Sequence, residues 1–427
     1  MVFTYLPGWK ITILLPLNFL YNIGIHAYGA GVSIATLFNK KAKTWAKGRQ
    51  NWLEKIETEI PPTDRIIWFH SASLGEAEQG LPIIERTKAE FTEHKILLTF
   101  FSPSGYEHFK DHPAVDYKMY LPLDTKSNAE NFISLVNPDL AFFIKYDIWG
   151  NYISQLDNVQ VPCILAPAVF SPKQFYFSGI GKRIYKPVLE KIKSIMVQDA
   201  KSAEVLKSAG ISKNVKICGD SRFDRSMDVA ASEYHDERIK EFVQTDFVLI
   251  GGSTYKNEEQ MILQWLRTSK NTQAIIAPHH IDDKNIKRLS KMFQEFKPAK
   301  YTSYDPVKLN SRVMIIDTIG KLKYMYRYGN MAFIGGGFGK SVHSTIEAIA
   351  YKIPIAFGPN HKKFIETGEM IKWGVGFEIK DSQHFIKITK RMRNIKNIRG
   401  FQELCEEYLA TKTGSVEKIM EEIRKLI

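Results

Sequence analysis

Short apolar runs alternate with amphipathic stretches along the chain from about residue 64. The run at 65–70 predicts a buried strand, and the segment at 76–91 predicts the helix that follows it. Further predicted strands lie at 95–101, 140–144, 161–165, 194–197 and 215–218. Strands and helices that alternate at this spacing indicate a parallel sheet covered on both faces.

A second series of the same kind follows the polar stretch at 226–241, and we place a domain boundary near 226–244. Its predicted strands lie at 247–250, 274–277, 313–316, 331–334 and 353–357. From about residue 397 the chain is predicted to be helical, with Ser415 capping a last helix that runs through Ile427. The expected fold class is α/β, with two facing, doubly wound, Rossmann-like domains and a ligand cleft at the carboxyl ends of their strands.

The chain is therefore expected to have four parts. Residues 1–50 form an N-terminal segment, 51–228 and 229–396 form the two Rossmann-like domains, and 397–427 form a helical tail.

The N-terminal segment has its own charge pattern. Residues 11–39 contain no Asp, Glu, Lys or Arg, and a basic cluster follows: Lys40, Lys41, Lys43, Lys47 and Arg49. An uncharged run of this length can span a bilayer, with the basic flank on the cytoplasmic side. Residues such as Pro16 and Gly24 interrupt it, so a helix lying in the membrane interface fits as well. A third reading is an apolar arm packed on the protein itself; we expect membrane association.

The composition indicates a folded protein, and the net charge indicates anionic binding partners. Among 427 residues, 44% are hydrophobic and 25% charged, and the formal net charge is +13. Such a charge suits nucleic acid, an acidic membrane surface or phosphorylated small molecules. Aromatic residues are not interleaved with a basic stripe, so we expect no nucleic-acid partner. The three cysteines have neither metal-binding nor disulfide spacing, which suits a reducing cytoplasm.

The first candidate site is the segment 70–76, His-Ser-Ala-Ser-Leu-Gly-Glu. It follows a predicted buried strand and opens a helix, which is where α/β sheets present active residues. A carboxylate at Glu76 can take a proton from an attacking sugar hydroxyl. Glutamate is also favoured in a first helical turn by the helix dipole alone, and that dipole weakens it as a base.

The second candidate site is a predicted strand that runs into the glycine-rich turn 335–337. The segment 344–347 then starts a helix; its residues are Ser344, Thr345, Ile346 and Glu347. Small residues and backbone N–H groups at such a point can hold a phosphate, and Glu347 can accept hydrogen bonds from ribose hydroxyls. With the Pro-containing strand that follows, this arrangement is similar to that in the C-terminal domains of two-domain (GT-B type) glycosyltransferases.

Other loops at predicted strand ends can line the same nucleotide pocket. They contribute Ser253, then Pro278, His279 and His280, then Ile319, Gly320, Lys321 and Leu322. The histidine pair has no Asp or Cys partner at ligand spacing, so we expect no metal site.

Taken together, these segments resemble the transferases of 3-deoxy-manno-octulosonic acid (Kdo) in lipopolysaccharide biosynthesis. The likeness runs from about residue 64 to the end of the chain. The matching blocks are 70–76, 99–105, 120–124, 219–224, 317–320, 335–347, 357–359 and 413–415.

The resemblance implies a cytidine monophosphate (CMP)–Kdo donor, a lipid A precursor as acceptor, and a location on the cytoplasmic face of the inner membrane. It implies inversion at the anomeric carbon without metal or other cofactor, and Glu76 as the general base. The nucleotide contacts it implies are Pro278 to His280, Ile319 to Leu322 and Ser344 to Glu347.

The chain departs from the family's pattern at several positions. Lys145 stands where the family has a glutamate, so it reverses the charge beside the presumed reaction centre and can bind the Kdo carboxylate or an acceptor phosphate. Arg222 stands where a lysine is common and keeps the charge. Together with Glu76, these two residues are expected at the reaction centre. His279 replaces an arginine and loses a permanent cation.

Other functions stay open. The same architecture serves transferases of other sugar nucleotides and the related epimerases. A non-catalytic, membrane-tethered binder of nucleotide sugars is a further alternative, because the Lys145 change can abolish activity.

Overall fold

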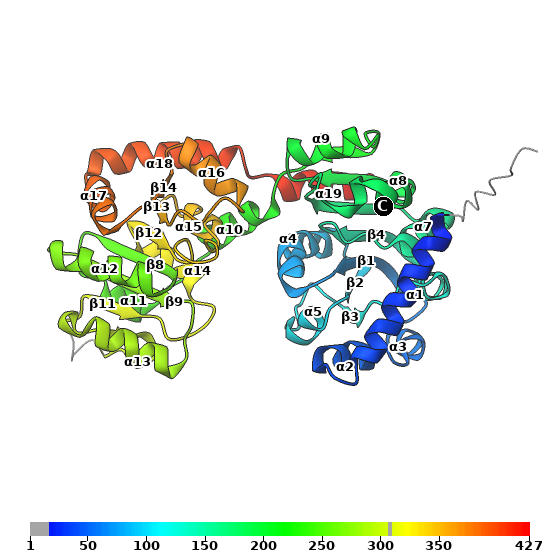
Figure 1. Ribbon diagram of the computed structural model, residues 1–427, viewed down its shortest axis with the longest axis horizontal. Coiled ribbons are helices and arrows are strands. Elements are labelled where there is room, and N and C mark those ends of the chain that lie inside the picture. The colour runs from blue at the N-terminus through cyan, green and yellow to red at the C-terminus, as the bar shows by residue number, and fades with distance from the viewer. Residues whose placement is uncertain (1–16, 306–309) are drawn as a thin grey trace, which may run out of the picture. The chain divides into compact units, whose positions relative to one another are not determined.

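The computed structural model describes residues 17–305 and 310–427, and the chain divides into two compact units (Figure 1). The first unit comprises the residues up to Ser221 together with Gly414–Ile427, and the second comprises Arg222–Thr413. The change of unit falls a few residues ahead of the expected 228/229. The expected tail, 397–427, is shared between the two units.

The first unit is built on a seven-stranded sheet whose strand order is β3-β2-β1-β4-β5-β6-β7. The paired strands all run parallel. The strands are β1 (Arg65–Ser71), β2 (His94–Phe100), β3 (Tyr117–Tyr120), β4 (Pro138–Ile144), β5 (Cys163–Ala168), β6 (Ser194–Val197) and β7 (Val215–Ile217).

Successive strand residues point to opposite faces of the sheet. Because both faces are apolar, helices cover both of them. Ile66 and Trp68 of β1 belong to one apolar cluster, and Ile67 and Phe69 belong to the cluster on the other face. The prediction of a parallel sheet buried on both sides is confirmed.

The helices of the first unit include one from the far end of the chain. Residues Ile419, Met420 and Ile423 of α19 are fully buried in the same cluster as α4, so the C-terminus completes the first unit (red in Figure 1). The helices are α1 (Leu17–Ala35), α2 (Lys40–Lys47), α3 (Trp52–Glu59), α4 (Leu74–Glu90), α5 (Pro103–His108), α6 (Lys126–Val136), α7 (Gly150–Asn158), α8 (Gly179–Lys191), α9 (Ala200–Ser208) and α19 (Ser415–Arg424).

The second unit repeats the plan with a seven-stranded sheet of order β10-β11-β9-β8-β12-β13-β14, again parallel. Its strands are β8 (Val248–Thr254), β9 (Gln273–Pro278), β10 (Ala299–Lys300), β11 (Val313–Ile315), β12 (Met331–Ile334), β13 (Ile355–Phe357) and β14 (Gly376–Glu378). Its helices are α10 (Ser221–Ala231), which begins at the unit boundary, α11 (Glu237–Phe242), α12 (Lys256–Thr268), α13 (Asp283–Met292), α14 (Leu322–Met325), α15 (Ile346–Ile349), α16 (Ile365–Lys372), α17 (Ser382–Met392) and α18 (Ile395–Ala410).

The predicted strands are all present, but three observed strands were missed. Strands β3, β10 and β14 lie at sheet edges, where a strand has one neighbour and needs fewer apolar residues. The expected N-cap at Ser415 is wrong. Gly414 occupies the cap position with φ 88°, a left-handed conformation that glycine adopts without strain, and Ser415 is the first residue of the helix.

The N-terminal segment contains α1, one side of which packs on the first unit. The Tyr21 hydroxyl donates to the buried carboxylate of Asp124 and accepts from the backbone N–H of Gly150 at 2.9 Å. Asp124 also accepts from the amides of Asn151 and Tyr152 at the start of α7. None of the described helices combines the length and the apolar character needed to cross a membrane. Residues 11–16 of the uncharged run lie outside the described part of the chain.

Shortening Ile423 to alanine tests the place of α19 in the first unit. The change leaves a cavity in a fully buried cluster, so we expect the free energy of unfolding of the first unit to fall by about 2–4 kcal/mol. Chemical denaturation followed by tryptophan fluorescence measures this loss. Glu421→Ala, at an exposed position of the same helix, is the control and should leave the transition unchanged. An Ile423→Ala protein as stable as the control would contradict the assignment.

Candidate functional site

The first site lies where the strand order of the first sheet reverses. Strands β1 and β4 are neighbours there, and the chain leaves them toward opposite sides. Open α/β sheets bind their ligands at the carboxyl ends of the strands at such a reversal. Glu76 follows β1, and Lys145 and Asp147 follow β4. The structure therefore brings Glu76 and Lys145, two of the predicted reaction-centre residues, to the same strand-order reversal.

Glu76 is half-buried in the first turn of α4. The hydroxyl of Ser73, the N-cap residue, donates to its Oε2 at 3.2 Å. Burial raises the pKa of Glu76 above its ordinary value, and the negative charge of Asp147 raises it further. The Lys145 charge, the Ser73 hydrogen bond and His70 act in the opposite direction. The net pKa is raised, so this carboxylate is a stronger base than its helix position alone predicts.

His70 and Asp147 form a pair behind Glu76 that the sequence analysis did not identify. The imidazole of His70 is fully buried, and its Nε2 lies 2.7 Å from Oδ2 of Asp147. Its Nδ1 lies 2.8 Å from the hydroxyl of Thr99. The indole N–H of Trp149 also donates to Oδ2 of Asp147 at 3.0 Å. These contacts hold a carboxylate beside Glu76 in a fixed orientation.

Lys145 adopts a left-handed backbone conformation, with φ 69°, directly after β4. Residues other than glycine seldom adopt it, and such positions cluster at functional sites. The Lys145 N–H still donates to the carbonyl of Ala166 on β5 at 3.3 Å, so the turn is held by the sheet. The Lys145 side chain is half-buried and is close enough to Glu76 to lower its pKa.

Arg222, the third predicted reaction-centre residue, belongs to the second unit. Its guanidinium lies 3.2 Å from the buried carboxylate of Glu366 in α16. The structure thus gives Arg222 a partner within its own unit.

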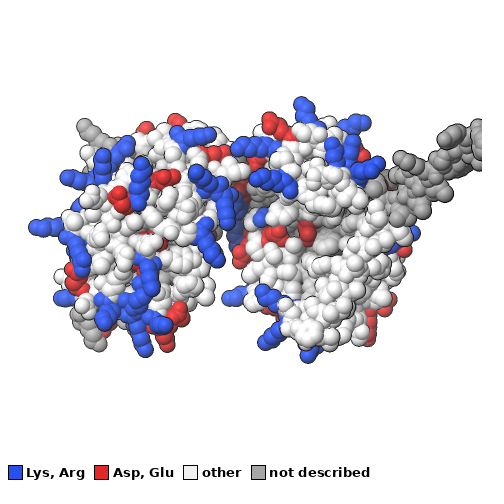
Figure 2. Space-filling view, in the orientation of Figure 1, with Lys and Arg blue, Asp and Glu red and all other residues white. Residues whose placement is uncertain are grey.

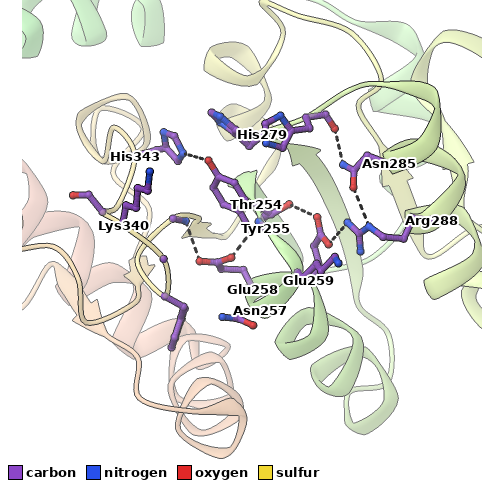
Figure 3. A pocket seen from close by; sticks show the side chains of 16 residues that line it. Thr254, Tyr255, Asn257, Glu258, Glu259, His279, Asn285, Arg288, Lys340 and His343 are labelled. Atoms are coloured by element: carbon purple, nitrogen blue, oxygen red, sulfur yellow. Dashed lines mark hydrogen bonds and ion pairs between the residues drawn. The ribbon is translucent and has the colours of Figure 1, made fainter.

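The second site lies where the strand order of the second sheet reverses, between β8 and β12. A cavity of about 690 Å³ opens there (Figure 3). We call it the donor cavity, after the nucleotide pocket that the sequence analysis expects in this unit. Residues from the ends of β8, β9 and β12 line it, among them Tyr255, His279, His280, Gly336, Lys340 and His343.

Buried carboxylates fix the walls of the donor cavity. Glu258 accepts from the N–H of Tyr255 at 3.1 Å, which caps α12, and from the N–H of Gly336 at 2.9 Å. Burial raises the pKa of Glu258. The neighbouring Glu259 is fully buried and pairs with Arg288, which also donates to Asn285 at 2.9 Å. The loop after β8 and the glycine-rich turn after β12 are therefore held together by Glu258.

Stacked rings form one side of the donor cavity. His279 stacks on Tyr255 at a centroid distance of 4.9 Å and on His343 at 4.6 Å. The Tyr255 hydroxyl lies 3.3 Å from Nε2 of His343. Burial lowers the pKa of both His279 and His343, and the positive charge of a neighbouring histidine lowers each of them further. At neutral pH these rings are uncharged, which suits stacking against a flat apolar face.

The structure groups only some of the predicted nucleotide contacts around the donor cavity. His279 and His280 line it, Pro278 is buried at the end of β9, and Ser253 adjoins the lining residue Thr254. Of the described residues, neither the set Ile319, Gly320, Lys321 and Leu322 nor the set Ser344, Thr345, Ile346 and Glu347 lines this cavity. The ammonium of Lys321 is held by Tyr234 at 3.1 Å and by Asp236 at 3.8 Å.

Tyr255 and His343 were not predicted as site residues. Tyr255 lies two residues after Ser253, and His343 directly precedes the predicted segment that begins at Ser344. A slightly longer segment would have included each of them. As for metals, residues 17–305 and 310–427 contain no group of three His, Cys, Asp or Glu side chains arranged to hold an ion.

Several known proteins that are similar to this chain are named for the same activity. Residues 46–225 match the family described as 3-deoxy-D-manno-octulosonic-acid transferase (kdotransferase). A 3-deoxy-D-manno-octulosonic acid transferase of Aquifex aeolicus is 27% identical, over 84% of this chain and 94% of its own length. The transferase of Haemophilus influenzae is 26% identical, over 73% and 74% of the two chains.

A longer relative, the bifunctional glycosyltransferase/methyltransferase of Fusobacterium nucleatum, is 23% identical. The match covers 78% of this chain but only 53% of that protein. The predicted resemblance to Kdo transferases is confirmed by these matches.

Solved structures support the fold. A UDP-N-acetylglucosamine 2-epimerase from Listeria monocytogenes aligns over 85% of this chain and 96% of its own, with a TM-score of 0.58 at 11% identity. A glycosyltransferase from Rickettsia africae aligns over 85% and 99%, with a TM-score of 0.57 at 12% identity. The prediction of two parallel-sheet α/β domains of GT-B type is confirmed.

Proposed function

We propose that this chain, a glycosyltransferase similar to the Kdo transferases, moves Kdo from CMP-Kdo to a lipid A precursor with inversion. The observation that carries the proposal is the pair of strand-order reversals, one with a base of raised pKa and one with a cavity of nucleotide size. Ligands of open α/β sheets bind at such reversals. The similarity to Kdo transferases supplies the identity of the substrates.

On the acceptor side, Glu76 is the general base. It takes the proton from an acceptor hydroxyl as that oxygen bonds to the anomeric carbon of Kdo. The bond between this carbon and the phosphate oxygen breaks in the same step, and cytidylate leaves. Burial raises the pKa of Glu76, and the charge of the fixed Asp147 carboxylate raises it further, which makes Glu76 a stronger base.

On the donor side, the donor cavity holds the nucleotide. The neutral rings of Tyr255, His279 and His343 offer a stacking surface, and Lys340 offers a positive charge. Lys145 takes the place of a family carboxylate, and its ammonium is suited to an anionic group of either substrate. The two substrates are bound together during transfer, which makes positioning a large part of catalysis.

The N-terminal segment attaches the enzyme to the cytoplasmic face of the inner membrane. On α1 and just beyond it, Phe19, Ile23, Ile34, Leu37 and Phe38 are exposed, with Leu37 at 74% and Phe38 at 87%. Their spacing places Phe19, Ile23 and Ile34 on one face of α1. Leu37 and Phe38 follow in the turn before α2, and the α2 lysines come next. Figure 2 shows that, among the charged side chains in view, Lys and Arg outnumber Asp and Glu. An apolar stripe beside lysines suits an anionic membrane surface.

Replacing Glu76 by glutamine tests the base. Glutamine keeps the shape but cannot take a proton, so we expect kcat to fall at least about 100-fold while CMP-Kdo affinity is unchanged. Mass spectrometry of the product with a lipid A precursor measures transfer, and calorimetry measures donor affinity. Glu78→Gln, at an exposed position of the same helix, is the control. Near wild-type turnover of Glu76→Gln would reject the assignment.

Two neighbours of Glu76 should shift the pH profile in opposite directions. The Asp147 charge raises the pKa of Glu76, so Asp147→Asn should move the acidic limb of kcat/KM to lower pH. The Lys145 charge lowers this pKa, so Lys145→Gln should move the same limb to higher pH. The measurement is kcat/KM against pH for both variants and the wild type. Shifts in the same direction, or no shifts, would argue against Glu76 as the titrating base.

Charge reversal on α2 tests membrane attachment. Each lysine near an anionic surface contributes about 1 kcal/mol, so Lys41→Glu, Lys43→Glu and Lys47→Glu together should lower binding to anionic vesicles by about two orders of magnitude or more. The matched control reverses Lys284, Lys287 and Lys291, which are equally exposed on α13. Vesicle co-sedimentation measures both proteins. Equal binding by the two triple variants would contradict the proposed role of α2.

A further inference from the structure

A second cavity of about 430 Å³ lies in the second unit, between the loop after β12 and the loop after β13. It shares Lys340 and Ser341 with the donor cavity. Asn360, Lys362, Lys363 and Glu378 complete the polar part of its lining. The two cavities therefore meet at the loop that carries Lys340 and Ser341.

The walls of this second cavity are fixed by backbone contacts. The amide of Asn360 donates to the carbonyl of Gly337 at 2.9 Å, and its side chain donates to the carbonyl of Gly339 at 2.8 Å. A Cβ on Gly337 would lie 2.5 Å from the backbone nitrogen of Gly358, so the two loops touch backbone to backbone. The shape of this second cavity is thus fixed by contacts between the two loops.

The charge of this second cavity is positive. Lys340, Lys362 and Lys363 are exposed and, within the described part of the chain, take part in no ion pair or hydrogen bond. Glu378 is the one acidic residue of the lining, and it is already engaged by Nε2 of the buried His361 at 2.9 Å. Three ammonium groups therefore face a single, partnered carboxylate.

Ser341 adds a buried hydroxyl to this second cavity. Its Oγ is inaccessible to solvent and has no hydrogen-bond partner among the described residues. Buried hydroxyls in folded proteins are nearly always hydrogen-bonded. An acceptor oxygen brought by a ligand would satisfy this hydroxyl at the point where the two cavities meet.

From these observations we infer that Lys340, Lys362, Lys363 and Ser341 form a second oxyanion subsite beside the donor cavity. The inference rests on the proposed function, because the proposed donor carries two anionic groups, the cytidylate phosphate and the sugar carboxylate. A ligand that places its phosphate in the donor cavity can place a second oxyanion here. The subsite binds a carboxylate or a phosphate monoester, from either the Kdo sugar or the lipid acceptor.

The test removes two of the lysines and compares ligands that differ in one anionic group. Calorimetry measures CMP and CMP-Kdo binding to the wild type and to the double variant Lys362→Ala, Lys363→Ala. Steady-state assays then measure KM for the acceptor with and without its phosphates. Lys372→Ala, an exposed lysine of α16 outside both cavities, is the control.

If the sugar carboxylate binds here, the double variant should bind CMP-Kdo at least about tenfold more weakly while CMP affinity stays unchanged. If the acceptor phosphate binds here, donor affinity should stay unchanged, and KM should rise only for the phosphorylated acceptor. Either result supports the subsite. Unchanged affinity and KM for every ligand, or an equal loss for CMP and CMP-Kdo, would overturn it.

A wild type that does not bind CMP-Kdo would instead count against the proposed function. Titration with inorganic phosphate then tests the subsite on its own. Phosphate binding that the double variant loses and Lys372→Ala keeps supports an oxyanion subsite, and binding that both variants retain overturns it.

Discussion

The reversal of strand order in each parallel sheet is the constraint on which both sites depend. Neighbouring strands at a reversal send their loops to opposite sides, so backbone does not fill the space above their carboxyl ends. In the first sheet this leaves Glu76 and Lys145 beside each other, though they are far apart in sequence. In the second it leaves the donor cavity between the loop after β8 and the glycine-rich turn after β12. The topology of each sheet thus determines where in that unit the candidate site lies.

The charged groups at the first site act on the pKa of Glu76 in opposite directions. Asp147 is bonded by Trp149 and lies against His70, so it holds its position and its negative charge acts on Glu76. The positive charge of Lys145 acts in the opposite direction. It lowers the pKa of Glu76, which burial and Asp147 raise. Partial desolvation and a neighbouring carboxylate both raise the pKa of a carboxyl group, and the proposed role of Glu76 as a base depends on this effect.

The strongly patterned parts of the fold were predictable, and the parts that depend on long-range contacts were not. The run at 65–70 identified β1 because both faces of that strand are buried, whereas edge strand β3 has polar residues and was missed. The position of Glu76 in the first helical turn after β1 was predictable, because a buried strand and a helix start are both visible in the local sequence. The pairing of His70 with Asp147 was not, because it joins residues whose strands become neighbours only in the folded sheet. Placement of α19 in the first unit depends in the same way on contacts that no local pattern encodes.

The distribution of cations in the second unit follows from its stacked rings. A permanent positive charge at position 279 would help to bind a phosphate. His279 instead packs against both Tyr255 and His343, and burial lowers its pKa, so it is neutral at physiological pH. The site therefore needs cations from elsewhere, and Lys340 lies on the wall shared with the second cavity. Two further lysines and an unsatisfied hydroxyl lie directly beyond it. The neutral rings thus lie on one wall, and the lysines that can bind anions lie on the next. A ligand with a flat base at one end and oxyanions farther along fits this order.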